Sequence, residues 1–275
     1  IKDKDSVEYL WQGDPTYWSG QAPVLFPICG SVRNDTVLYD QEDGSQVKGK
    51  IPRHGLVRKK EFELVNQTEN SVTFAIENDE EMYANYPYHF RLEITYTVTG
   101  KTIRTQYEIY NKEAEKSMSY FIGGHPGFNC PLLEDEVYED YYLEFEKPET
   151  CTVPKPFPET GMLDFKDRSS WLENQKEIDL NYDLFSYDAV TLDNLESRSV
   201  SLKSRKHDKG LKLHFEEFPN LIVWSTLNKG PFIALEPWSG LSTSLEEGDR
   251  LEDKKDVKVL KPGEFVQLGF DIEIL

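Results

Sequence analysis

The chain has 275 residues, of which 38% are hydrophobic and 29% charged, and it contains 15 tyrosines and 15 phenylalanines. This length can bury a large core in one domain, and the aromatic-rich composition excludes a disordered chain. The formal net charge is −19, and no run of Lys and Arg is long enough to form a local basic patch. Nucleic acid, anionic membrane surfaces and strongly anionic substrates are therefore disfavoured unless cations gather locally, and a neutral ligand is expected.

The three cysteines, Cys29, Cys130 and Cys151, are an odd number without metal-like spacing. This usage indicates buried thiols in a reducing compartment, so we expect a cytoplasmic protein with no disulfide and no zinc site. No apolar run is long enough to cross a bilayer. Because the chain begins with Ile1 rather than Met, we also expect that an N-terminal piece, and any targeting signal in it, is absent.

The first 25 residues place Trp11, Tyr17 and Trp18 among glycines and prolines, which is typical of a loop that caps a core or flanks a ligand. Residues 24–30 form a short apolar run that predicts a buried strand ending near Arg33. The polar, turn-rich residues 44–52 then predict a loop that carries Arg53, His54 and Gly55.

From residue 72 onward, apolar side chains alternate with polar ones, as in half-buried strands. The predicted strands cover residues 72–76, 90–98, 103–109, 141–145, 200–203, 211–215, 221–225, 232–236 and 265–274. Gly100 and Lys101 predict the clearest hairpin. Prolines 148, 154, 156 and 158 predict a long irregular loop, and residues 169–175 a short helix. Together these features predict one domain, an all-β, large antiparallel β-sandwich with long loops, and not a TIM barrel or Rossmann fold.

The segment 121–131 is the first candidate site, because it places His125 between Gly124 and Pro126 at the end of an alternating stretch. Its backbone must turn sharply where a titratable side chain lies, although the same residues also fit a strand-ending turn with a solvated histidine. His54 likewise lies beside a glycine on a predicted loop. No histidine spacing suits a metal, so general acid–base work is the more suitable chemistry for this pair.

A strongly apolar stretch, residues 232–235, leads directly into Glu236, and Pro237 is expected to stop the strand there. A carboxyl group at a partly desolvated strand end would have a raised pKa, which suits a general base. Glu236 could equally accept hydrogen bonds from its own loop. Trp238 offers a flat face on which a sugar ring could pack, or it could cap the core. Arg33 and Arg53 could each donate to vicinal hydroxyls, but for Arg53 a surface ion pair is the favoured interpretation.

Four separated motifs together resemble the aldose 1-epimerase (galactose mutarotase-like) family, and within it the chain looks most like the LacX-type branch. They are Phe-Pro-Ile at 26–28 followed by Arg33, Pro-Arg-His-Gly at 52–55, Gly-Gly-His-Pro-Gly-Phe-Asn at 123–129, and Glu-Pro-Trp-Ser-Gly at 236–240. The resemblance covers nearly the whole chain. It implies a large antiparallel β-sandwich with a sugar cleft on a concave face and no cofactor or metal.

The resemblance also implies roles for individual residues. His125 would be the general acid that protonates the ring oxygen O5, and Glu236 the general base that takes the proton from the C1 hydroxyl. His54 would lie beside the acid, and Arg33 would bind the substrate. The family's substrate-binding Asp is assigned to Asp188, while the expected N-terminal strands with a Gly-Ala-Glu-like turn are not found, so the domain, residues 1–275, is expected to lack them.

The predicted function is thus interconversion of the α and β anomers of an aldohexose. Three alternatives stay open at this point: a hexose-6-phosphate 1-epimerase, a non-catalytic sugar-binding or sensory module on the same fold, and a glycoside hydrolase. The first would need cations to cover the phosphate, for which Arg33, Arg53 and Arg58 are available, but the net charge of −19 weighs against it. The last lacks an assignable second catalytic carboxylate. Neither the sugar nor the oligomeric state follows from the sequence.

Overall fold

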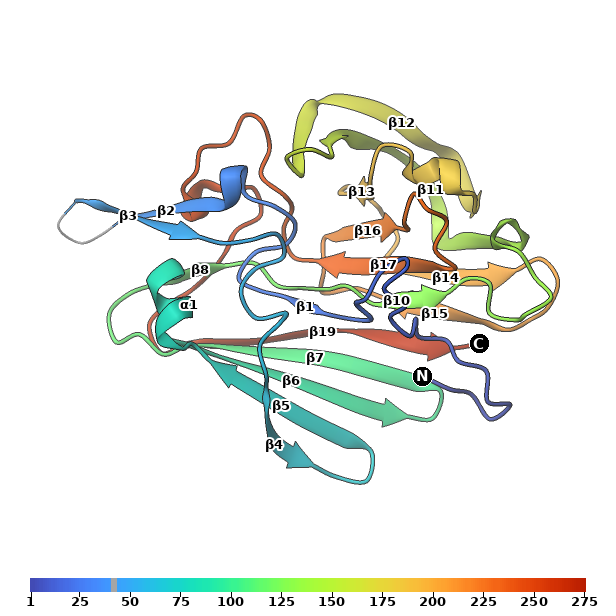
Figure 1. The fold of residues 1–275 in the computed structure, drawn as a ribbon, viewed down its shortest axis with the longest axis horizontal. Helices are drawn as coiled ribbons and strands as arrows, with labels where there is room; N and C mark the ends of the chain where they lie inside the picture. Colours follow the sequence, from blue (N-terminus) through green and yellow to red (C-terminus); the bar gives the residue numbers. More distant parts are fainter. Residues whose placement is uncertain (41–43) are drawn as a thin grey trace.

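Antiparallel strands make up most of the molecule, in a computed structural model that describes residues 1–40 and 44–275 (Figure 1). The larger sheet has nine strands. In spatial order they are β12 (Met162–Asp179), β11 (Tyr141–Phe157), β14 (Ser199–Ser204), β15 (Gly210–His214), β19 (Phe265–Ile274), β7 (Thr102–Asn111), β6 (Phe90–Thr99), β5 (Ser71–Glu77) and β4 (Glu63–Gln67). Every pair in this order is antiparallel.

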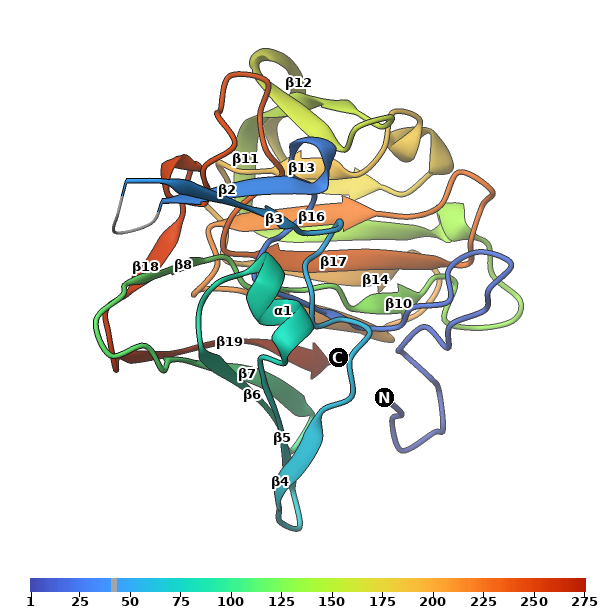
Figure 2. The ribbon, with the colours of Figure 1, turned by 60° about the vertical axis from the view of Figure 1, so that its left-hand side comes forward.

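A second sheet of six strands lies over the first, as Figures 1 and 2 show. Its main path is β1 (Val24–Leu25), β9 (Gly123–Gly124), β17 (Phe232–Trp238), β16 (Asn220–Trp224) and β13 (Val190–Leu192), and β10 (Gly127–Asn129) also pairs with β17. Two small ladders join β18 (Lys258–Leu260) to β8 (Met118–Tyr120) and β2 (Thr36–Asp40) to β3 (Gln46–Lys50).

Helical structure is confined to short pieces that connect strands. The helix α1 (Glu80–Asn85) begins at Asp79, whose side chain accepts a hydrogen bond from the Met82 amide, as an N-cap residue does. The 3₁₀ turns are η1 (Arg33–Asp35), η2 (Tyr138–Asp140), η3 (Tyr182–Phe185) and η4 (Leu251–Asp253). In the described part of the chain, no helix has both the length and the apolar character needed to cross a membrane.

The core lies between the two sheets, because alternate residues of the strands face inward. On β6, Phe90, Leu92 and Ile94 are buried, and the intervening residues are more exposed, as the period of two requires. Gly124 on the smaller sheet packs so closely on the larger one that a Cβ atom there would lie 2.6 Å from the Phe270 ring. The two layers therefore meet directly under the segment that carries His125, which confirms the predicted β-sandwich.

The sequence predicted most of these strands, and the hairpin at Gly100 and Lys101 is confirmed, with Thr99 paired to Thr102. The short helix predicted at 169–175 is wrong, because this segment belongs to β12 and pairs with β11. The long irregular loop predicted from the prolines is also wrong. Pro148, Pro154 and Pro156 lie within β11, whose ladder accommodates their missing N–H groups through register shifts.

Two further boundaries differ from expectation. Pro237 does not stop its strand, since β17 continues to Trp238 and Pro237 pairs with Leu221. The strand predicted at 24–30 is limited to β1, and the chain after it is buried but irregular from a cis Phe26–Pro27 peptide onward. The predicted loop 44–52 contains β3, and its residues 44–50 follow a segment outside the described residues.

Candidate active site

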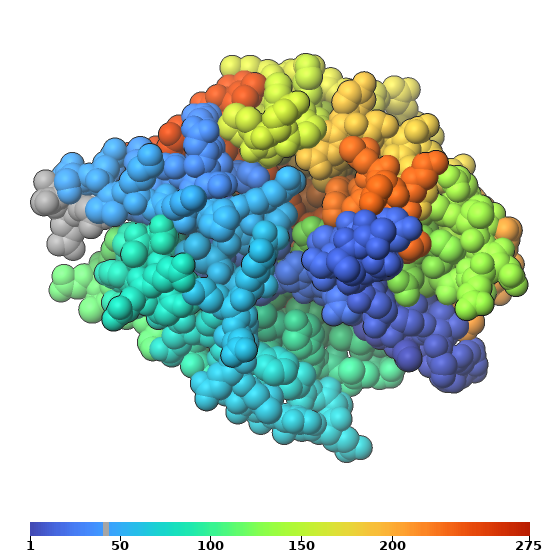
Figure 3. All heavy atoms as spheres, in the orientation of Figure 1, coloured from blue at the N-terminus to red at the C-terminus, as the bar shows by residue number. Residues whose placement is uncertain are grey.

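A cleft of about 220 Å³ opens on the smaller sheet and contains most of the residues singled out in the sequence. Its lining comprises Trp18, Pro23, Arg53, His54, Arg58, His125, Asp188, Ala189, Ile222, Trp224, Glu236 and Trp238. In Figure 3 the dark-blue N-terminal segment, the light-blue segment around residue 55 and the orange segment around residue 225 meet on the displayed face of the molecule. Segments from all parts of the chain thus form one site.

His125 reaches the cleft because the turn between β9 and β10 is fixed at both ends. Gly124 pairs with Val24 on β1, and Gly127 pairs with Ala234 on β17. The turn itself is held by hydrogen bonds from the His125 amide to the Pro23 carbonyl and from the Leu235 amide to the Pro126 carbonyl. The predicted turn at 121–131 therefore places its histidine directly beside β17.

Glu236 lies in the middle of β17, opposite Ile222 of β16. The distance from His125 Nε2 to Glu236 Oε2 is 3.3 Å, and both side chains are buried. Glu236 Oε2, His125 Nδ1 and Trp238 Nε1 have no hydrogen-bond partner within the described residues. Since buried polar atoms are nearly always satisfied, three such atoms in one cleft indicate a place for a polar ligand.

Burial sets the protonation of this pair. Desolvation, with smaller contributions from the positive charges of Arg53 and Arg58, lowers the pKa of His125 to about 3. Burial also raises the pKa of Glu236 well above its usual value, although Arg53 opposes this shift. These opposite shifts favour the proton on the carboxyl group and a neutral imidazole. Aromatic rings cause much of this desolvation, since Trp18 stacks on the His125 ring at 4.7 Å and Trp224 meets it edge-on.

His54 lies at the other side of His125, with their ring centroids 5.4 Å apart. Its backbone has a φ of 70°, a left-handed conformation that ordinary residues rarely adopt outside constrained sites. The Gly30 amide donates a hydrogen bond to His54 Nδ1, so the neutral ring carries its proton on Nε2. Burial, together with His125 and the two arginines, holds the pKa of His54 well below 6.5. His54 is thus a fixed neutral donor.

Asp188 and Arg53 form a polar edge of the cleft, with Asp188 Oδ2 3.7 Å from an Arg53 nitrogen. Asp188 has a φ of 124°, and its side chain accepts a hydrogen bond from the Ala189 amide. Arg53 does make the ion pair that the sequence favoured, but it also lines the cleft.

Arg33 is the predicted site residue that the structure does not bring to the cleft. Its guanidinium lies 3.3 Å from Asp249 and donates to the carbonyl groups of Ser244, Leu245 and Glu247. It holds this loop in place, and it is not among the lining residues. We therefore assign it no contact with a ligand.

Sequence reasoning did not assign six other lining residues to the sugar site: Trp18, Pro23, Arg58, Ala189, Ile222 and Trp224. Trp18 carried a signal, since aromatics in a loop rich in glycine and proline commonly flank a ligand. Arg58 was considered only as a cation for a phosphorylated sugar, and Trp224 carried no signal, because the tertiary fold brings it to His125. Within residues 1–40 and 44–275 no group of three or more His, Cys, Asp or Glu side chains could hold a metal ion. The three cysteines are free and buried.

Both the sequence and the sandwich fold match known proteins. The family model described as aldose 1-epimerase matches residues 1–258, and the chain belongs to this family. Two LacX proteins of Lactococcus lactis subsp. lactis, chromosomal and plasmid, are 61% and 60% identical to it over 275 residues, which is 100% of this chain and 92% of each relative.

Solved structures show the same fold. A galactose mutarotase related enzyme from Lactobacillus acidophilus aligns with a TM-score of 0.89 at 30% identity, covering 98% of this chain and 88% of the other. A galactose mutarotase-like protein from Lactobacillus casei aligns with a TM-score of 0.87 at 28% identity, covering 98% and 90%. The family and the fold predicted from the four motifs are both confirmed.

Proposed function

We propose that the protein is an aldose 1-epimerase that interconverts the α and β anomers of a free aldohexose, with His125 and Glu236 as its acid–base pair. The observation that carries this proposal is the 3.3 Å approach of His125 Nε2 to Glu236 Oε2 in a buried cleft with unsatisfied polar atoms. Anomerisation needs a proton added to the ring oxygen O5 and a proton removed from the C1 hydroxyl. These two oxygens are bonded to the same carbon, so two adjacent groups can serve both.

The pair can cycle between two states that hold the same number of protons. With the proton on His125, the imidazolium protonates O5 while the Glu236 carboxylate accepts the proton of the C1 hydroxyl, and the ring opens. The proton is then on Glu236. After rotation about the C1–C2 bond, the carboxyl group returns a proton to the carbonyl oxygen, and the O5 hydroxyl returns one to His125. Neither a covalent intermediate nor a net proton exchange with solvent is required.

The protein environment favours the second of these states, since burial lowers the pKa of His125 and raises that of Glu236. A bound sugar supplies hydroxyl groups that replace some of the lost solvation and stabilise the charged state. His54, which is neutral with its proton on Nε2, is positioned to donate a hydrogen bond next to the acid. The remaining edge, Asp188 with Arg53, offers an acceptor and donors for ring hydroxyls.

Polarimetry with freshly dissolved α-glucose and α-galactose tests the proposal. The wild-type chain should accelerate mutarotation, and Glu236→Gln or His125→Asn should each lower kcat by about 10²–10⁴-fold, the range for loss of a general acid or base. The chain offers matched controls in His214→Asn and Glu273→Gln, because His214 and Glu273 form a similar pair outside the cleft, 3.0 Å apart. Both controls should keep the wild-type rate.

Three results would contradict the proposal. Rates no faster than buffer across a panel of free sugars would remove the enzymatic claim. Calorimetric sugar binding without mutarotation, unaffected by Glu236→Gln, would instead identify a binding module. Activity confined to hexose 6-phosphates would identify the phosphorylated sugar as the substrate.

A further inference from the structure

Another pocket adjoins the candidate active site on the side of Asp188. This side pocket measures about 460 Å³ and lies between β11, β12 and the segment that leads into β13. Asp188 and Ala189 line both the side pocket and the cleft that contains His125 and Glu236. The cleft alone, at about 220 Å³, falls below the roughly 300–1,000 Å³ typical of ligand sites. The two cavities together offer room for a ligand larger than one sugar ring.

The side pocket lies where the edges of the two sheets meet. β12 is the last strand of the larger sheet and β13 the last strand of the smaller one, and Figures 1 and 2 show β12 over β13. β11 pairs with β14 only over residues 141–145, so the rest of β11 forms a two-stranded arm with β12. Arg168 joins this arm to Asp193 by two hydrogen bonds of 2.6 and 3.2 Å. The walls are therefore fixed before a ligand binds, which reduces the entropy lost on binding.

Trp171 is turned towards the side pocket by an irregularity in β12. Leu172 pairs with Cys151 and Ser170 pairs with Thr152, so Trp171 between them is the extra residue of a bulge. Bulges often re-aim a side chain beside a functional site. Trp171 Nε1 is buried and has no hydrogen-bond partner within residues 1–40 and 44–275. The indole thus carries a free donor that a ligand hydroxyl group could satisfy.

Tyr187 provides a second aromatic face in the side pocket. Its exposed fraction of 80% is the largest of any bulky hydrophobic residue in the described part of the chain. An aromatic face left in water loses free energy that contact with an apolar surface would recover. One face of a pyranose ring is such a surface, because its C–H groups point to the same side. The next residue, Asp188, has a φ of 124°, and backbone strain of this kind is commonly retained at ligand sites.

The polar groups of the side pocket suit a neutral ligand. Among the side chains that line this pocket and not the cleft, the charged ones are Lys155 and Asp167, which pair with each other at 2.7 Å. Ser169 and Thr191 add hydroxyl groups. Aromatic faces, hydroxyl groups and balanced charge together match a sugar ring better than an anion or a wholly apolar molecule.

We propose that the side pocket binds a second sugar ring, attached to the aldose that reacts at His125 and Glu236, and that the preferred substrate is a reducing disaccharide. This inference rests on the proposed function and specifies its substrate class. An aldose whose C1 and O5 face the acid–base pair directs its remote hydroxyl groups away from that pair. A ring linked to one of these hydroxyl groups passes Asp188 and Ala189, which border both cavities.

Mutarotation kinetics with sugars that share one reacting unit test the inference. Glucose is compared with maltose, cellobiose, lactose and melibiose, in which glucose is the reducing unit and only the attached ring and its linkage differ. At least one disaccharide should have a kcat/KM about tenfold above that of glucose, mainly through a lower KM. Tyr187→Ala should lower this ratio about fivefold, and Tyr187→Phe should keep it because the ring remains. The control Tyr83→Ala removes an exposed tyrosine that lines neither cavity and should keep the wild-type ratio.

Calorimetry on the Glu236→Gln variant measures binding without turnover and separates this inference from the proposed function. Tighter binding of a disaccharide than of glucose, weakened by Tyr187→Ala in the same background, supports the second ring even if no sugar is turned over. Glucose that is turned over and bound as well as every disaccharide would overturn the inference and leave the epimerase in place. A disaccharide preference that Tyr187→Ala does not change would also overturn it, because the second ring would then lie outside the side pocket.

Discussion

At the scale of single residues, the central feature is a carboxyl group and an imidazole that are both buried for function rather than stability. Glu236 is fully desolvated inside a strand, and its Oε2 atom has no partner in the described chain. Such a group costs free energy of folding whenever it must ionise. Active sites commonly carry costs of this kind.

Glu236→Gln should therefore stabilise the protein at neutral pH while it removes activity. The folded-state pKa of Glu236 is raised above 4.5, so its contribution to stability is present below pH 4.5 and is lost as the pH rises through the folded-state pKa. Glutamine does not titrate. The difference in unfolding free energy between variant and wild type should increase from pH 5 to pH 8 in urea titrations. A difference that is constant or decreases would contradict the raised pKa.

His54→Asn should reduce the sensitivity of the fold to mild acid. The pKa of His54 is lowered below 6.5 in the folded protein, so its contribution to stability is present above pH 6.5 and is lost as the pH falls towards the folded-state value, by at most about 1.4 kcal/mol per pH unit. Asparagine can keep the acceptor for the Gly30 amide. Glu236 titrates in the opposite sense but is common to both proteins. Equal stability losses between pH 7 and pH 5.5 would show that His54 is not buried as a neutral ring.

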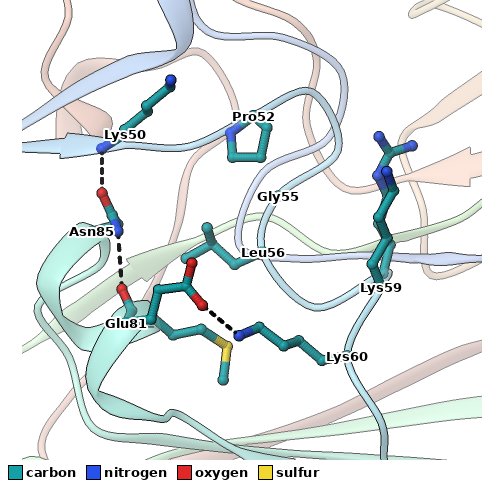
Figure 4. A pocket seen from close by; sticks show the side chains of 10 residues that line it. Lys50, Pro52, Gly55, Leu56, Lys59, Lys60, Glu81 and Asn85 are labelled. Atoms are coloured by element: carbon teal, nitrogen blue, oxygen red, sulfur yellow. Dashed lines mark hydrogen bonds and ion pairs between the residues drawn. The ribbon is translucent and has the colours of Figure 1, made fainter.

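At the scale of elements, the segment 52–60 separates the candidate active site from a second cleft of about 410 Å³ (Figure 4). His54 and Arg53 face the first, Lys59 and Lys60 line the second, and Arg58 lines both. The segment is fixed by the bridge between Phe26 and Gly55 and by the hydrogen bond from the His54 amide to the Gly30 carbonyl. Its position depends on the absence of a side chain at Gly55.

Gly55→Ala should therefore cost much more stability than an alanine at an open glycine. Gly100 is the matched control, because it also has a positive φ but has no atom within 4 Å of the added Cβ. We expect a loss of about 1 kcal/mol for Gly100→Ala and about 2–4 kcal/mol for Gly55→Ala. Chemical denaturation gives both values. Equal losses would show that the contact with Phe26 is not rigid.

Sequence and structure agree where local pattern determines the outcome. The hairpin at Gly100 and Lys101 has alternating strands and a two-residue turn, so no distant contact was needed to predict it. Residues 169–175 look helical by themselves and become β12 only because β11 lies beside them. The candidate active site likewise combines residues that a local motif identifies with residues that only distant contacts bring near. The motifs gave His54, His125 and Glu236, whereas Trp224 is brought to His125 by the tertiary fold alone.

At the scale of the whole molecule, the dominant property is the charge of −19. Many surface cations are paired with acids, as Arg104 is with Glu217 and Asp271, and the excess of negative charge repels itself across the surface. The cleft lined by Lys50, Arg58, Lys59 and Lys60 is a small region where positive side chains outnumber negative ones.

Salt should accordingly stabilise the fold. Raising NaCl from about 10 mM to about 300 mM shortens the screening length roughly fivefold and weakens this repulsion, so Tm should rise by a few degrees in thermal scans. The variant Glu69→Lys, at an exposed turn position, lowers the net negative charge and should show a smaller rise. A Tm that falls with salt would mean that the ion pairs outweigh the repulsion.

The stacking of Trp18 on His125 also provides an optical signal. An indole that lies 4.7 Å from an imidazole ring, nearly parallel to it, fluoresces differently when the imidazole is neutral and when it is charged. The emission of Trp18 should thus report the movement of the proton between His125 and Glu236. Binding of a sugar could be followed in the same way, in real time and without a label.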